Sequence, residues 1–174
     1  MKKRGFEVVS AYEKEGIQLP IRATKHAAGY DFEAAADMVI PSIWRGGLLP
    51  VLKGLVQKEE AATITKAIKP SLVPTGIKAY MGADEFLQLC NRSSNPLKRF
   101  LVLTNGVGVI DSDYYNNPDN EGHIYFQFTN FGPLDVKIKK GERIGQGIFL
   151  PFLKADQDVS NKERTGGFGS SGQG

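Results

Sequence analysis

The sequence GVGVIDSDY, residues 106–114, decides how the rest of the chain is interpreted, because an apolar, glycine-broken run leads directly into two acids and a tyrosine. The apolar part is too short and too rich in glycine for a helix, so it predicts a strand that enters a tight turn. Asp111 and Tyr114 would then lie at the turn, where side chains can face a ligand. Asp111 and Asp113 alternate along the chain, and a turn between them can point one inward and the other outward. A carboxylate in a cleft can deprotonate water, and it can equally cap the turn through a hydrogen bond to the backbone.

Short segments of alternating polarity lie on both sides of this stretch. In residues 123–129, Ile124, Phe126 and Phe128 share one face of an extended strand. Further strand candidates are residues 6–11, 72–80, 135–139 and 144–152, the last interrupted by two glycines. Several short strands at this spacing predict an all-β sandwich or barrel.

Residues 45–68 interrupt the β pattern. Leu49, Leu52 and Val56 recur near helical spacing, which predicts a helix within about residues 49–68. Such a helix would cover an open sheet face or contact a partner. From residue 155 the chain is polar and then rich in Gly and Ser, a composition typical of segments that stay disordered without a partner. We therefore expect one β domain over residues 1–154 and a flexible tail over residues 155–174.

Composition and charge narrow the functional classes. The chain has 174 residues, 41% of them hydrophobic, which suits one domain. A net charge of +3 from scattered Lys and Arg argues against a polynucleotide as partner. One cysteine excludes an internal disulfide, and no apolar stretch is long enough to cross a membrane, so a cytoplasmic protein is expected. No P-loop occurs, and His26 and His123 lack metal-ligand spacing, so we expect both histidines at the surface or behind a site.

Four further segments combine residue types suited to phosphate or a nucleobase. They are AAGYDF at 27–32, NRSS at 91–94, GERIGQ at 141–146 and RTGGFGSSG at 164–172. Arg92 offers a forked donor to phosphate, although the same residues are common in surface loops. In the tail, glycine backbone N–H groups can surround an anion and Phe168 can stack on a base, although a Gly/Ser tail is also typical of a plain linker.

In this order, and together with residues 106–114, these segments resemble the trimeric dUTP pyrophosphatase (dUTPase) family of bacterial or phage type. The resemblance covers nearly the whole chain and leaves out the candidate helix near residues 49–68. It implies an all-β, jelly-roll-like distorted β-barrel with a short inserted helix, assembled as a homotrimer. The active sites would lie at subunit interfaces, and the flexible tail of one subunit would close a neighbouring site.

The resemblance also implies the reaction, a Mg²⁺-dependent hydrolysis of dUTP to dUMP and pyrophosphate that keeps uracil out of DNA and supplies dUMP for thymidylate synthesis. Asp111 would activate the water that attacks the α-phosphorus. The Mg²⁺ would be held mainly by substrate phosphates and water, with no direct protein ligand. Tyr114 would pack on the deoxyribose and exclude a 2′-hydroxyl, and Asp31 and Asp113 would support the site.

The remaining substrate contacts implied by the resemblance fall into three groups. Residues expected at the uracil edge are Asn105, Gly108, Val109 and Ile110. Residues expected at the phosphates are Arg92, Ser93, Ser94 and Gln146. In the tail, Arg164 would contact the γ-phosphate, Phe168 would cover the uracil, and further substrate contacts would come from Gly167, Gly169, Ser170 and Ser171.

Two other functions stay open from the sequence. A dCTP deaminase-like enzyme of the same fold would need extra groups at the cytosine ring, which the sequence does not locate. A regulatory or interaction protein of the dUTPase fold would use the segment near 49–68 and the long loop 115–122. The expected partners are therefore dUTP and further copies of this chain, with no polynucleotide and no membrane.

Overall fold

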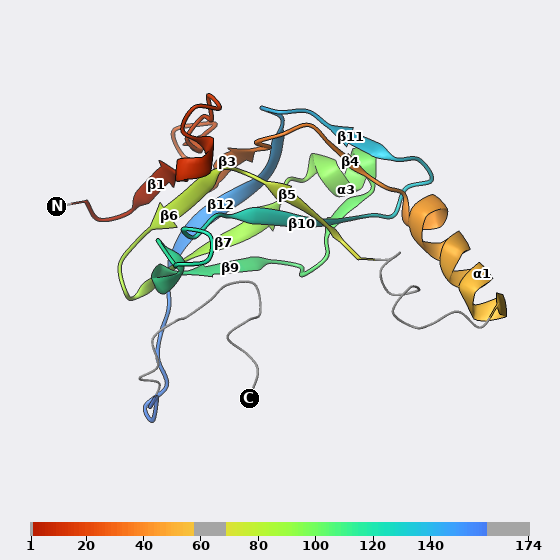
Figure 1. Ribbon diagram of the computed structural model, residues 1–174. Coiled ribbons are helices and arrows are strands. Elements are labelled where there is room, and N and C mark those ends of the chain that lie inside the picture. Colours follow the sequence, from red (N-terminus) through yellow and green to blue (C-terminus); the bar gives the residue numbers. More distant parts are fainter. Residues whose placement is uncertain (1, 58–68, 160–174) are drawn as a thin grey trace.

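The computed structural model describes residues 2–57 and 69–159, and strands make up most of the regular structure (Figure 1). The strands are β1 (Gly5–Val8), β2 (Ile21–Arg22), β3 (Tyr30–Glu33), β4 (Met38–Ile40), β5 (Ser71–Pro74), β6 (Ile77–Tyr80), β7 (Glu85–Asn91), β8 (Leu101–Leu103), β9 (Gly108–Asp111), β10 (Tyr125–Asn130), β11 (Val136–Ile138) and β12 (Arg143–Pro151). The helical elements are η1 (Ser10–Tyr12), η2 (Ile43–Leu48), α1 (Leu49–Gln57), α3 (Ser94–Arg99) and η3 (Ser112–Tyr114).

The strands form four antiparallel sheets. The largest has five strands in the order β2-β3-β12-β7-β9, and a second has the order β5-β10-β8. Two-stranded pairs, β1-β6 and β11-β4, complete the set. The predicted all-β class is confirmed, and the sheets are arranged around one shared core instead of closing into a single continuous barrel.

The core lies between the five-stranded sheet and the β5-β10-β8 sheet. Ile124, Phe126 and Phe128 are each fully buried, as their alternation predicts. Phe126 packs against Phe128, with ring centroids 6.2 Å apart, and against Phe32 of β3, at 5.6 Å. Burying one such side chain stabilises the fold by about 1.5–3 kcal/mol, so these rings fix how the two sheets face each other.

Three strand predictions need correction. Residues 72–80, expected as one strand, form two strands, β5 and β6, which are separated at Gly76 (φ +69°) and belong to different sheets. The first predicted strand, residues 6–11, ends at Val8 and is followed by the short 3-10 helix η1. The last, predicted to be interrupted by its glycines, is one continuous strand, β12. A Cβ on Gly145 would lie 1.9 Å from Phe126 Cε1, and one on Gly147 would lie 2.6 Å from Phe32 Cε2. The glycines therefore make room for core rings and do not break the strand.

The insertion begins at η2, slightly before the predicted residue 45, and continues as α1. Its root is anchored, because the Trp44 indole N–H donates to the carbonyl oxygen of Phe131 at 3.1 Å and the Ser42 hydroxyl donates to that of Gly132 at 2.6 Å. From this root α1 projects beyond the edge of the β body (Figure 1). In the described residues α1 continues directly from η2 and does not cover a sheet face (Figure 1), and residues 58–68 of the predicted helix lie outside the described residues.

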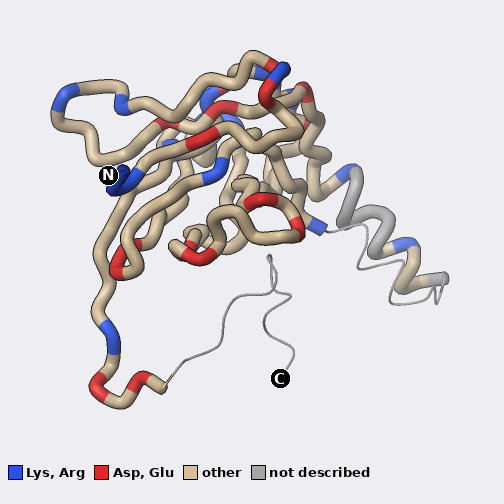
Figure 2. The backbone as a smooth tube through the Cα atoms, turned by 60° about the vertical axis from the view of Figure 1, so that its left-hand side comes forward, with Lys and Arg blue, Asp and Glu red and all other residues tan. Residues whose placement is uncertain are grey.

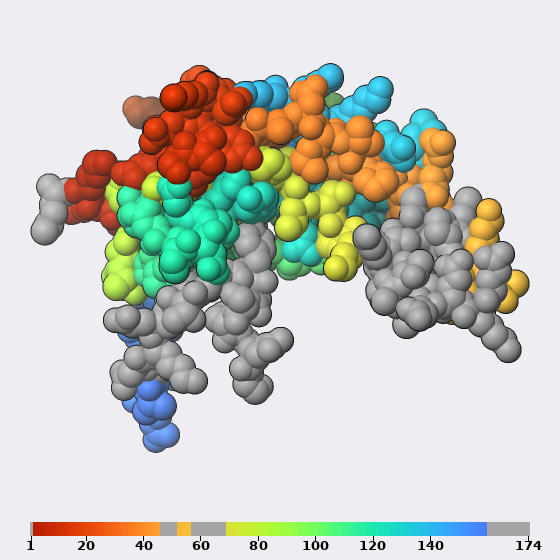
Figure 3. Space-filling view, viewed as in Figure 1, coloured from red at the N-terminus to blue at the C-terminus, as the bar shows by residue number. Residues whose placement is uncertain are grey.

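The N-terminal segment packs against the loop that follows η3, which Figure 3 shows as red atoms against teal ones. In the view of Figure 2, the Lys and Arg positions of the described residues are interspersed with Asp and Glu positions along the backbone. Across residues 2–57 and 69–159, no helix is both long and apolar enough to span a membrane.

Candidate functional site

The carboxylate of Asp31 lies at the centre of a group of side chains that could donate hydrogen bonds to a phosphate. Asp31 is 6% exposed and lies on β3, directly opposite Gln146 of β12. Its two oxygens accept hydrogen bonds from Gln146 Nε2 at 3.0 Å and from Arg143 Nη1 at 3.1 Å. Arg92 Nε lies 3.8 Å from the same carboxylate. One acid from the first predicted segment thus orients side chains from two others.

Hydrogen bonds to a distant part of the chain fix the segment around Arg92. The Arg92 guanidinium donates to the carbonyl oxygen of Arg143 at 3.0 Å, so β7 and β12 are joined beside the Asp31 group. Asn95, 2% exposed, donates to Asn91 Oδ1 at 2.8 Å and to the carbonyl oxygen of Ile144 at 2.7 Å. These bonds hold the start of α3 against the sheet. Ser93 and Ser94, which directly follow Arg92 in the sequence, lie at this helix start.

The turn between β8 and β9 connects two different sheets. Its Gly106 has φ +70°, a left-handed conformation that favours glycine, and its N–H donates to the carbonyl oxygen of Leu103 at 3.0 Å. Asn105 is exposed beside it. Along β9, Val109 is 57% exposed and Ile110 is 8% exposed, so successive side chains of the strand face opposite sides of the sheet.

Asp111 ends β9 on the side opposite the buried Ile110, and is partly buried there. It pairs with Phe86 of β7 and begins η3, which contains the exposed Asp113 and the buried Tyr114. The predicted strand and turn at residues 106–114 are therefore confirmed. Tyr114 is 4% exposed, and its hydroxyl donates to the carbonyl oxygen of His123 at 3.0 Å.

The two parts of the predicted site lie far apart within one chain. Asp31 is level with Gln146 and Cys90 across the five-stranded sheet, whereas Asp111 is level with Phe86, four residues along β7. Three strand spacings and a four-residue displacement together give a separation of about 20 Å. If Asp111 acts at the α-phosphate, two further phosphates cannot cover that distance to the Asp31 group of the same chain.

The structure brings together some predicted residues and leaves others apart. Asp31, Arg92 and Gln146 form one group, while Asn105 lies in the turn before the edge strand β9 and Asp111 and Tyr114 lie at the other end of that strand. The predicted tail residues Arg164, Gly167, Phe168, Gly169, Ser170 and Ser171 lie outside the described residues.

Sequence reasoning missed three polar residues with structural roles at this site. Arg143 pairs with Asp31, and its place in the segment 141–146 was the available signal. Asn95 carried no such signal, because an asparagine after Arg-Ser-Ser is common in polar surface loops. His123, expected at the surface or behind a site, is 4% exposed, so a surface position is wrong.

Comparison with known proteins decides the family. The dUTPase family model matches residues 56–172, more than half of the chain. The chain belongs to the dUTPase family. A curated deoxyuridine 5′-triphosphate nucleotidohydrolase of Lactococcus lactis is 51% identical over 174 residues, covering 99% of both chains. The rat enzyme of the same name is 33% identical over 164 residues, covering 91% of this chain and 64% of the rat chain.

Solved structures agree with this dUTPase assignment. The crystal structure of the dUTPase from Streptococcus mutans is 45% identical, with a TM-score of 0.70 over 87% of this chain and 98% of that chain. The dUTPase from phage phi11 of S. aureus is 15% identical, with a TM-score of 0.64 over 92% of this chain and 97% of that chain. The phage protein supports the fold alone, and its structure was described for a species-specific insert.

Proposed function

We propose that this dUTPase-family chain is a dUTP diphosphatase that hydrolyses dUTP to dUMP and pyrophosphate. The observation that carries the proposal is the group around Asp31, in which one buried carboxylate orients Arg92, Arg143 and Gln146. Phosphoryl transfer needs positioning and neutralisation of oxygen charge more than covalent help. Guanidinium forks and an amide donor supply both.

Asp111 is proposed as the base that activates water for attack on the α-phosphorus. It stands at the end of β9 and faces away from the core, on the side of the exposed Val109. A carboxylate within hydrogen-bond reach of a water, directly in line with the phosphorus, is the geometry that general-base catalysis requires. The pyrophosphate leaves as the water oxygen bonds to the α-phosphorus, and the proton passes to the carboxylate.

The turn around Asn105 is proposed to contact the uracil edge through Gly108, Val109 and Ile110. The tight turn at Gly106 leaves Asn105 exposed beside the strand. Tyr114 is proposed to border the deoxyribose and exclude a 2′-hydroxyl, and its buried ring makes it a fixed wall. Asp113, exposed next to it, is proposed to support the site.

Mg²⁺ is the proposed cofactor. Within residues 2–57 and 69–159, no three His, Cys, Asp or Glu side chains converge as a metal cluster. This donor set fits an ion held mainly by the triphosphate oxygens and water, because Mg²⁺ usually binds through substrate phosphates and few carboxylates. When bound, the ion neutralises phosphate charge and orients the triphosphate.

A homotrimer with shared sites is the proposed assembly. The gap of about 20 Å between the Asp31 group and Asp111 calls for a second copy that brings one group next to the other. The outer face of the five-stranded sheet carries Ile21 and Val109, which are 70% and 57% exposed. Apolar side chains on an uncovered sheet face are typical of a subunit contact. The tail from residue 155, with Arg164 and Phe168, is proposed to close a neighbouring site.

The reaction is tested by incubating the protein with dUTP, dCTP, dTTP and UTP plus Mg²⁺ and following pyrophosphate and ammonia. We expect a strong preference for dUTP, whereas ammonia from dCTP would indicate a deaminase instead. Asp111→Asn should retain dUTP binding, measured by calorimetry, and lose about 10²–10⁴-fold in kcat. Asp119→Asn, which removes an exposed acid from the following loop, is the matched control and should keep wild-type turnover. Normal turnover of Asp111→Asn would refute the assignment of the base.

A further inference from the structure

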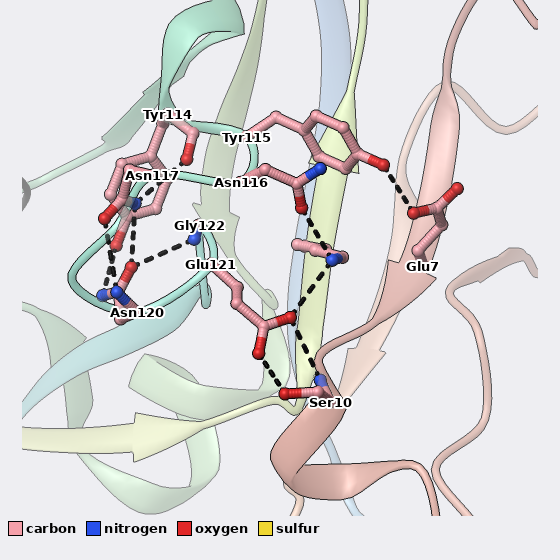
Figure 4. A network of polar contacts seen from close by, with 10 residues as sticks. Glu7, Ser10, Tyr114, Tyr115, Asn116, Asn117, Asn120, Glu121 and Gly122 are labelled. Atoms are coloured by element: carbon pink, nitrogen blue, oxygen red, sulfur yellow. Dashed lines mark hydrogen bonds and ion pairs between the residues drawn. The ribbon is translucent and has the colours of Figure 1, made fainter.

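The loop 115–122 is firmly attached on its outer side (Figure 4). Glu121 accepts hydrogen bonds from the Ser10 hydroxyl and backbone N–H, and it pairs with Lys78 at 3.2 Å. The Ser10 hydrogen bond is the main reason that the pKa of Glu121 lies below its usual value. Tyr115 donates to Glu7 of β1 at 2.6 Å. The N-terminal segment and β6 therefore hold the loop in one place.

The inner side of the same loop holds Tyr114. Asn120 Nδ2 donates to the Tyr114 hydroxyl at 2.9 Å, while that hydroxyl donates to the carbonyl oxygen of His123 at 3.0 Å. At the other end of the residue, Asn117 Nδ2 donates to the carbonyl oxygen of Tyr114 at 3.0 Å. The side-chain tip and the backbone of Tyr114 are thus both fixed by one short loop, as Figure 4 shows.

Asn120 is itself fixed in position. Its Oδ1 accepts hydrogen bonds from Asn117 Nδ2 at 2.9 Å and from the Gly122 N–H at 3.0 Å. Gly122 has φ +80°, and a Cβ there would lie 2.5 Å from the carbonyl oxygen of Tyr114. The loop therefore passes so close to the tyrosine that only glycine fits at this position. This close approach is consistent with a loop that holds Tyr114 in one position.

We propose that Asn120, supported by Asn117, is a positioning residue that sets discrimination between deoxyribose and ribose by fixing the ring of Tyr114. The inference rests on the proposed function, in which this ring borders the sugar. Steric exclusion of a hydroxyl depends on ring position, because repulsion rises steeply over a few tenths of an ångström. Hydrogen bonds from two directions at the phenol oxygen oppose tilting of the ring, and loss of the Asn120 bond removes one of these two restraints.

The test measures kcat/KM for dUTP and for UTP in the wild type, Asn120→Ala, Tyr114→Phe and the double variant. Tyr114→Phe keeps the ring and removes the hydroxyl that Asn120 contacts. We expect each single variant to raise the UTP-to-dUTP ratio of kcat/KM about tenfold, a size typical of a pocket that distinguishes one small group. The double variant should show no further rise, because both changes remove the same interaction.

Asn116→Gly is the matched control in the same loop. Asn116 accepts a hydrogen bond from Lys78 Nζ at 2.7 Å on the outer side, and glycine tolerates its φ of +57°. Its ratio should equal that of the wild type, since a general loss of loop stability lowers both activities together.

Three outcomes distinguish failure of the positioning role of Asn120 from failure of the proposed function. An active, discriminating wild type with an unchanged ratio in Asn120→Ala would overturn the positioning role alone. If Asn120→Ala does not fold, Tyr114→Phe removes the same bond from the other side, and an unchanged ratio there overturns the role equally. A wild type without dUTP hydrolysis would refute the proposed function, and the inference with it.

Discussion

His123 is a buried titratable group whose neutral form is built into the fold. It is 4% exposed, and its Nε2 accepts a hydrogen bond from the Gly76 N–H at 2.9 Å. Its ring lies against Tyr12 and Tyr125, with centroids 5.1 Å and 4.1 Å away. Burial lowers the pKa of His123 from 6.5 to about 4. Protonation would also remove the acceptor for Gly76, so the folded chain holds this imidazole unprotonated.

This depressed pKa predicts a loss of stability on mild acidification. Below pH 6.5 His123 is protonated in the unfolded chain, whereas in the folded chain it stays neutral down to about pH 4. The folded state therefore loses stability as the pH falls across that window. Between pH 7 and pH 5 the loss should reach about 2 kcal/mol. For a chain of this size the melting temperature should fall by about 4–8 °C, measured by calorimetry at fixed protein concentration.

His123→Gln separates this effect from other acid-sensitive groups. Its amide oxygen can still accept from Gly76, but it does not titrate. The variant should therefore be less stable than the wild type at pH 7 and nearly insensitive between pH 7 and pH 5. Glu7 and Glu121, whose pKa values are lowered by hydrogen bonds from Tyr115 and Ser10, stay charged in this window. An equal pH slope in both proteins would contradict the assignment.

At the scale of single residues, the sequence identifies candidate site residues when their neighbours in the sequence are unusual. Asp111 follows a glycine-rich apolar run, and Asp31 stands between aromatics, so both attract notice. Asn95 and Asn120 do not, because asparagine is common in polar segments and their importance comes from burial and from partners elsewhere in the chain.

Among the elements, β12 depends most on residues without side chains. It is the central strand of the five-stranded sheet, between β3 and β7. Gly145→Ala would place a Cβ 1.9 Å from the ring of Phe126, which is itself fully buried. The ring or the strand must then move, and we expect a loss of about 3 kcal/mol, the upper part of the usual range for an overpacked core.

Urea unfolding at fixed protein concentration measures this loss, and Gly82→Ala provides the control. A Cβ on Gly82 meets the end of the Asp84 side chain at 2.8 Å, and that side chain can rotate away. The control should therefore unfold near the wild-type midpoint. A Gly145→Ala variant as stable as the control would show that the core accommodates a methyl group next to Phe126.

The same sheet explains why sequence patterns predicted some elements and missed others. Residues 123–129 alternate clearly because one face is core, so β10 was predicted. β7 was not, since Leu87 and Leu89 face the core while the other side carries Phe86 and Cys90, with Gln88 as the one clearly polar residue between them. If a second subunit covers that outer face, as we propose, both sides of β7 are interior and the polar alternation that marks a strand is weakened.

For the whole molecule, the order of the five family-like segments predicts one substrate site. Which of these segments touch within one chain depends on strand register. Asp31 meets Gln146 because their strands pair at those positions, and Asp111 falls about 20 Å away because β9 pairs lower on β7. No local sequence pattern encodes such a register, so the sequence alone could not show which predicted residues meet within one chain.

That separation leads to a test of shared sites by subunit complementation. Asp111→Asn and Arg92→Ala should each be nearly inactive alone, since each disables one part of every site. Co-expressed with different tags and purified on both, mixed trimers should regain activity, because about one site in three then joins two unaltered parts from different subunits. The matched control pairs Arg92→Ala with Gln146→Ala, which lie in the same Asp31 group and should give no recovery. Mixed Asp111→Asn and Arg92→Ala oligomers without recovery would mean that one chain alone supplies both parts, against the distance that the strand register imposes.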